Sequence, residues 1–148
     1  MQLRLPRSMR VTLGRAGVPA WTLALALAAC GADRYIVIGT AQAPSACGFV
    51  ELNGTTDQST QLRVRLEHLH PVDSLDPALH AYVVWFESGK DAAVRAGALK
   101  YRPDDRLGEL RAVSPYRKFI VKVTAEANDT PSVPSSFVIA SEEISTLD

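Results

Sequence analysis

The sequence lacks the short motifs that mark common catalytic sites. It contains no Gly-x-Ser-x-Gly elbow, no Walker loop and no His-Glu-x-x-His pair. Adjacent carboxylates occur at Asp104–Asp105 and Glu142–Glu143, but neighbouring side chains of an extended chain point apart and do not form an acid–base couple. These absences predict that the protein is not an enzyme and holds no cofactor.

Sulfur-containing side chains are also scarce. Methionine occurs only at Met1 and Met9, which disfavours a copper carrier because such proteins use sulfur donors. Cysteine occurs only at Cys30 and Cys47. An odd cysteine can form an intermolecular bond or act as a reactive thiol, but no His, Lys or Arg lies within ten residues of Cys47 to activate it. We expect Cys47 to be a small buried residue between Ala46 and Gly48.

No apolar run is long enough to cross a bilayer as a helix. Residues 16–29 carry no charge and are strongly apolar from Trp21 onward, but a spanning helix needs about 20 apolar residues. Four arginines and no acidic residue precede this run. A basic start, an apolar middle and small residues before Cys30 are the parts of a secretory signal, which we predict for residues 1–29.

The end of this segment, Leu27-Ala-Ala-Cys30, resembles the lipobox of bacterial lipoproteins. The resemblance implies that Cys30 takes a diacylglycerol on its sulfur and becomes the new N-terminus, followed by a lipidated tether over residues 30–34. Two or more acyl chains, palmitate among them, would anchor the protein stably. In many bacteria Asp after the cysteine retains a lipoprotein at the inner membrane, so Gly31 favours the outer membrane. The domain would lie in the periplasm or at the cell surface. The alternative is an ordinary secreted protein with a chance cysteine.

Removal of residues 1–29 changes the charge balance. The whole chain holds 16 basic and 16 acidic residues, and the predicted signal carries four of the basic ones. Residues 30–148 therefore hold 12 basic and 16 acidic residues, a net charge of 12 − 16 = −4 with histidine neutral. Such a domain has no electrostatic reason to bind nucleic acid. We expect contact with the membrane through lipid on Cys30, and an envelope protein as any further partner.

The remaining residues are rich in short β-forming segments. In Gln61–His68, apolar Leu62, Val64 and Leu66 alternate with polar residues, as in a half-buried strand. His80–Glu87 is apolar on both faces, which is typical of a central strand, and we expect its Trp85 to be the largest core side chain. We predict strands at 35–41, 47–52, 61–68, 80–87, 94–101, 107–112, 118–125 and 136–140.

The spacing of these segments predicts the fold class. About eight strands every 8–12 residues, without a strong helical period, favour an all-β sandwich or barrel. We predict an immunoglobulin-like antiparallel sandwich of about 7–8 strands over residues 35–141, behind an N-terminal signal helix. A reversal is expected at Asn53-Gly54, a helical turn near Ser74, and a polar tail over residues 142–148.

The second half of the chain carries a second resemblance. Its pieces are Tyr82-Val-Val-Trp85, Ala96-Gly-Ala-Leu99, Gly108, Val123-Thr-Ala-Glu126, Pro131, Pro134 and Val138. Their order resembles the extracytoplasmic β-sandwich of anti-sigma-K-type factors, which implies a sandwich in an extracytoplasmic setting. Those factors also carry a sigma-binding helical domain and a membrane-spanning helix. We identify neither here, so the resemblance implies no sigma-factor binding.

Three histidines form the most metal-like cluster. His68 and His70, two residues apart on a predicted strand, would share a face, with His80 ten residues on and Asp73 and Asp76 nearby. Zinc usually needs three or four ligands. The simpler interpretation is that these histidines are solvated or bond to backbone at a strand end.

A basic edge is predicted from Arg111, Arg117, Lys118 and Lys122. Lys118 and Lys122 project from the same face of one strand, which is typical of an edge strand protected against aggregation rather than of a binding patch.

The leading hypothesis is a lipid-anchored extracytoplasmic β-sandwich lipoprotein that serves as a binding or structural module of the bacterial cell envelope. The alternative is a periplasmic metal-binding protein that uses His68 and His70, with His80 as a further candidate.

Overall fold

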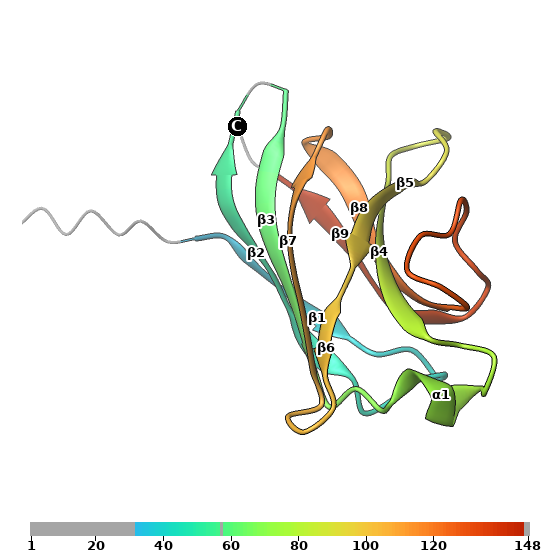
Figure 1. The fold of residues 1–148 in the computed structure, drawn as a ribbon. Coiled ribbons are helices and arrows are strands. Elements are labelled where there is room, and N and C mark those ends of the chain that lie inside the picture. Colours follow the sequence, from blue (N-terminus) through green and yellow to red (C-terminus); the bar gives the residue numbers. More distant parts are fainter. Residues whose placement is uncertain (1–31, 57, 147–148) are drawn as a thin grey trace, which may run out of the picture. The chain divides into compact units, whose positions relative to one another are not determined.

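The computed structural model describes residues 32–56 and 58–146 (Figure 1). These residues form nine strands and one short helix. In chain order the elements are β1 (Arg34–Ile38), β2 (Cys47–Thr55), β3 (Thr60–Glu67), α1 (Val72–Leu75), β4 (Ala81–Glu87), β5 (Val94–Ala98), β6 (Lys100–Arg102), β7 (Leu107–Ser114), β8 (Lys118–Glu126) and β9 (Val138–Ser145).

The strands form two antiparallel sheets. One sheet has five strands in the order β1-β2-β3-β7-β6, and the other has four in the order β5-β4-β8-β9. Their inner faces pack together, and apolar side chains from both form one core in which Phe86 and Phe119 meet edge to face, with ring centroids 5.3 Å apart. The predicted all-β, sandwich-like fold is therefore confirmed, as is the helical turn near Ser74.

The segment 94–102 passes from one sheet to the other. We predicted a single strand at 94–101, but β5 pairs with β4 while β6 pairs with β7 of the opposite sheet. Leu99 lies at the crossing, where its backbone N–H donates to the carbonyl of Tyr82 at 2.8 Å. Gly97 has φ 145°, a conformation that glycine adopts without the penalty other residues incur. Residue alternation alone does not reveal such a change of sheet.

The two sheets are also joined at the opposite side of the sandwich. Gly39, just beyond β1, forms an isolated antiparallel bridge with Ala140 of β9. The N–H of Thr40 donates to the carbonyl of Ile139 at 2.8 Å. Both pairs of sheet edges are thus joined by backbone contacts, which reduces the unpaired edge available for aggregation.

Two predicted boundaries are wrong. The chain does not reverse at Asn53-Gly54, because β2 continues to Thr55 across a register shift between Leu52 and Gly54. The reversal comes after it, where the N–H of Thr56 donates to the carbonyl of Ser59 at 2.8 Å. The predicted polar tail at 142–148 does not begin at Glu142, because β9 extends to Ser145 and buries Ile144 against the core. One buried residue among polar neighbours is the pattern of a strand end with one buried face, and a polar composition alone does not distinguish it from a tail.

The start of the domain also differs from the prediction. Arg34 belongs to β1 rather than to the tether, and the carbonyl of Asp33 accepts a hydrogen bond from the N–H of Leu52 at 2.9 Å. The predicted signal peptide, its helix and the lipidation site Cys30 lie outside the described residues. Among the residues that the structure describes, no helix has the length and apolar character to span a bilayer.

Strand β4 is buried on both faces, as its sequence predicts. It lies between β5 and β8, and its inner face contributes Tyr82, Val84 and Phe86 to the core. Trp85 is the largest fully buried side chain among the described residues, as predicted, but it lies on the opposite face of β4 and outside the cluster between the sheets. In Figure 1 the chain between β8 and β9, residues 127–137, covers this outer side of β4, and we call it the covering segment.

A polar network joins Trp85 to that covering segment. The indole Nε1 donates to Thr124 Oγ1 at 2.8 Å, and this hydroxyl donates in turn to Glu126 Oε1. The same carboxylate oxygen accepts from the backbone N–H of Ser135 at 2.8 Å. Arg95 adds a contact from β5, through Nη1 to the carbonyl of Pro131 at 2.7 Å. Because each buried polar group has a partner, the segment covers Trp85 without a desolvation penalty for unpaired groups.

Replacing Trp85 with Ala should reduce the free energy of unfolding by about 3–5 kcal/mol, because it empties a fully buried site and leaves Thr124 without its donor. Denaturant unfolding of the full chain measures this. Val133→Ala serves as the control, since Val133 is 71% exposed in the covering segment, and should change stability by less than about 0.5 kcal/mol. A cost below about 1 kcal/mol for Trp85→Ala would contradict this packing.

Candidate functional site

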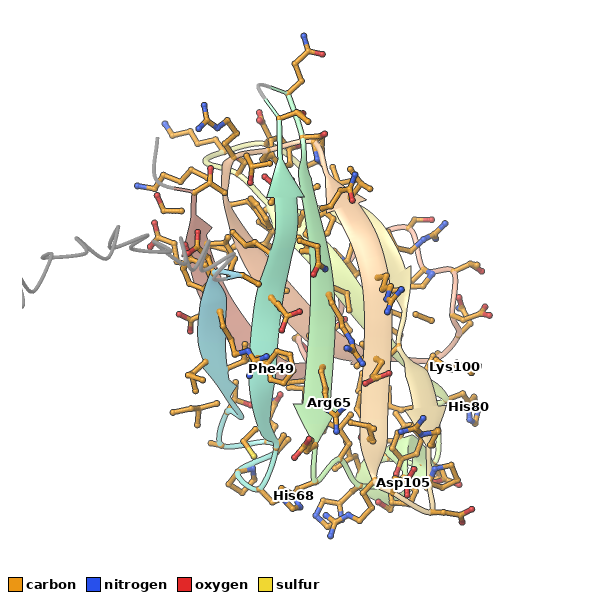
Figure 2. All side chains as sticks on the ribbon, turned by 90° about the vertical axis from the view of Figure 1, so that its left-hand side faces the viewer. Phe49, Arg65, His68, His80, Lys100 and Asp105 are labelled. Carbon is orange, nitrogen blue, oxygen red and sulfur yellow. The ribbon has the colours of Figure 1, made fainter. Side chains whose placement is uncertain are left out.

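The outer face of the five-stranded sheet carries the densest set of charged side chains with defined partners. Alternation along β2 and β3 turns their leucines and valines inward and these charged side chains outward. Figure 2 looks onto this face and labels Phe49 and Arg65 on it. The strand residues that we call the outer face are Arg34, Ile36, Ile38, Cys47, Phe49, Glu51, Arg63, Arg65, Glu67, Lys100, Arg102, Glu109 and Arg111.

The strand register aligns three arginines around one glutamate. Arg34 lies opposite Glu51, Glu51 opposite Arg63, and Arg63 opposite Arg111, so four neighbouring strands contribute to one row. We call Arg34, Arg63 and Arg111 with Glu51 the arginine row. Arg34 Nη2 is 2.6 Å from Glu51 Oε2, and the Arg34 side chain is 54% exposed. Glu51, Arg63 and Arg111 also line a hollow of about 390 Å³ on this face.

In the next row the apolar pair Ile36 and Phe49 adjoins the ion pair of Arg65 and Glu109. Arg34 Cζ lies 4.2 Å from the ring centroid of Phe49, a cation–π contact that links this row to the first. Glu109 Oε1 is 2.7 Å from Arg63 Nη2 and 3.2 Å from Arg65 Nη1. Partial burial raises the pKa of Glu109, but the hydrogen bond from Arg63 and the charges of Arg63, Arg65 and Arg102 outweigh it and lower the pKa.

Two isoleucines and the unpaired cysteine form the apolar margin of the outer face. Ile36 is 63% exposed and Ile38 is 69% exposed, although both belong to an ordered strand. Cys47 lies opposite Ile38 and is itself exposed, so the predicted burial of Cys47 is wrong. Its neighbour Ala46 is the buried residue, and alternation then directs Cys47 outward.

Basic residues outnumber acidic ones on the outer face. Six strand residues are basic and three are acidic, whereas residues 30–148 as a whole carry a net charge of −4. Asp105, in the turn beside β6, pairs with Arg102 at 3.0 Å. The face therefore presents a positive surface on an acidic domain, which favours an anionic partner.

The three histidines do not share an ion site. Strand β3 ends at Glu67 and His68 has φ 59°, so the alternation assumed for His68 and His70 does not apply. His70 Nε2 is 3.2 Å from Arg106 Nη2, a cation that disfavours a metal ion there. Figure 2 shows His80 apart from His68. The described residues contain no group of three or more His, Cys, Asp or Glu that could hold a metal ion.

The predicted basic edge is also not assembled. Lys118 and Lys122 lie on β8, which is an inner strand between β4 and β9, so they do not guard an edge. Lys122 Nζ is 2.6 Å from Glu87 Oε1, and Lys118 Nζ is 3.4 Å from Glu143 Oε1. Arg111 lies on β7 of the other sheet, where it belongs to the arginine row.

Sequence reasoning identified part of the outer face but not the arginine row. Alternation predicts that Arg63 and Arg65 face solvent, and this is confirmed. It does not show that Arg34 and Arg111 lie in the same row as Arg63, because that depends on strand order and register. The signal available was the spacing of two residues between Arg63 and Arg65, which places both on one face of their own strand only.

The architecture defines a β-rich, sandwich-like domain with a positively charged outer sheet face. Comparison of the sequence with models of protein families and with curated proteins, and of the fold with solved structures, finds no match.

Replacing Glu109 with Gln should reduce stability in a way that depends on pH. The folded protein holds the pKa of Glu109 below its usual value of 4.5, so its charge stabilises the fold above that pH, and this contribution is lost as the pH falls through the folded-state value. Urea unfolding of wild type and variant at pH 7, 5 and 3.5 measures the difference. We expect the stability gap to narrow below about pH 4.5, and a constant gap would contradict the ion-pair assignment.

Proposed function

We propose that this protein is a lipid-anchored extracytoplasmic lipoprotein that serves as a binding or structural module of the bacterial cell envelope. The observation that carries the proposal is the order of a basic start, a short apolar run and Leu27-Ala-Ala-Cys30 in the sequence. Under this proposal Cys30 is acylated and residues 1–29 are removed. Gly31 favours the outer membrane, with the domain in the periplasm or at the surface.

The short connection between Cys30 and the sheet supports this proposal. Asp33 is already bonded to β2, so the domain begins three residues after the proposed anchor. An envelope setting also agrees with a β-rich domain whose outer sheet face is charged. The immunoglobulin-like character of the sandwich and its relation to anti-sigma-K-type factors belong to this proposal and rest on the order of the quoted sequence pieces.

Labelling with radioactive palmitate in a bacterial host tests the anchor. Wild-type protein and a Cys47→Ser variant should both take up label and sediment with membranes, because Cys47 is not the acylation site. Cys30→Ala should take up no label. A Cys30→Ala protein that is still labelled, or a wild-type protein recovered soluble and unlabelled, would contradict the proposal.

A further inference from the structure

The chain between the proposed anchor and the domain is too short for the domain to move far from the bilayer. The carbonyl of Asp33 is held by the N–H of Leu52 at 2.9 Å, so Asp33 is fixed to β2. Three peptide units separate Asp33 from Cys30, so the Cα atoms of these two residues lie at most about 11 Å apart in any conformation. If Cys30 is acylated, the start of β1 stays within about this distance of the headgroups.

The arginine row begins at the residue after Asp33. Arg34 is the first residue of β1, and Glu51, Arg63 and Arg111 extend the row across three further strands. The tether therefore leaves the domain beside its most basic row. Planar guanidinium groups bind phosphate oxygens through paired hydrogen bonds, so this row suits phospholipid headgroups.

Apolar residues adjoin the same row. Ile36 follows Arg34 on the outer side of β1 and is 63% exposed, and Ile38 beyond it is 69% exposed. Surfaces that combine exposed apolar side chains with basic ones bind at the boundary between headgroups and acyl chains. Charge, exposed apolar area and tether length thus all favour a bilayer as the surface that covers this face.

We propose that the outer face of the five-stranded sheet docks on the anionic phospholipid surface of the membrane to which Cys30 is anchored. Arg34 and Arg111 contact headgroup phosphates, and Ile36 and Ile38 reach the headgroup–acyl boundary. The proposal rests on the lipid anchor proposed above and adds an orientation to it. The four-stranded sheet and the segment 127–137 then face away from the bilayer and remain open to partners.

The exposed thiol of Cys47 reports directly on this docking. Cys47 lies on the outer face opposite Ile38, and Cys30 is blocked by lipid in the anchored protein. The full-length lipidated protein is reconstituted into vesicles of phosphatidylglycerol and phosphatidylethanolamine, or of phosphatidylcholine alone. A bulky water-soluble maleimide then measures the rate of Cys47 alkylation. A Cys47→Ser/Val133→Cys variant carries its thiol on the covering segment of the other sheet. Its alkylation reports the fraction of molecules whose domain lies on the outer side of the vesicles, where the reagent is.

On anionic vesicles the rate at Cys47 should fall at least about fivefold relative to phosphatidylcholine vesicles, while the rate at Val133→Cys stays unchanged. Arg34→Gln/Arg111→Gln should restore fast alkylation of Cys47. Lys90→Gln/Arg95→Gln removes the same number of charges from the other side of the domain and should leave Cys47 protected.

Three other results would overturn the docking. Equal alkylation of Cys47 and Val133→Cys on an anchored protein refutes the docked orientation and leaves the anchor intact. Protection that increases with protein density at fixed lipid composition shows that a second copy covers the face. A wild-type protein that carries no lipid and does not enter vesicles refutes the anchor, and the orientation with it.

Discussion

The antiparallel register of β1, β2, β3 and β7 is the constraint on which the rest of the structure depends. It places Val50, Val64 and Leu66 in the core, and the same pairing brings Arg34, Glu51, Arg63 and Arg111 into one row on the opposite side. A shift by one residue would exchange the two faces and expose the core. Burial of apolar side chains therefore also determines the position of the charged row.

The sequence predicted those features that depend on local alternation. The predicted strand at Gln61–His68 is confirmed as β3, which ends one residue earlier at Glu67, and the two-sided burial of β4 is confirmed as well. A residue pattern of period two reports burial directly. Features that depend on non-local pairing were not predictable in this way. The change of sheet near Leu99, the extension of β9 to Ser145 and the outer position of Trp85 all depend on which strands meet.

The same distinction explains the outcome for the candidate site. Cys47 was expected to be buried because its neighbours are small, but its direction is set by pairing with Ile38 and not by the size of Ala46 or Gly48. The basic edge was expected on an edge strand, but the strand of Lys118 and Lys122, β8, lies between β4 and β9. Arg111, assigned to that edge, instead completes the arginine row. The predicted anchor at Cys30 lies before the described domain and stays a prediction.

Anchoring at Cys30 is the central claim, because the location of the protein and the orientation of its charged face both depend on it. Intact-mass measurement of the native protein from isolated membranes tests it most directly. The account predicts a chain that begins at residue 30 and carries the added mass of acyl groups. An unmodified chain with the full mass of 16.0 kDa would contradict it.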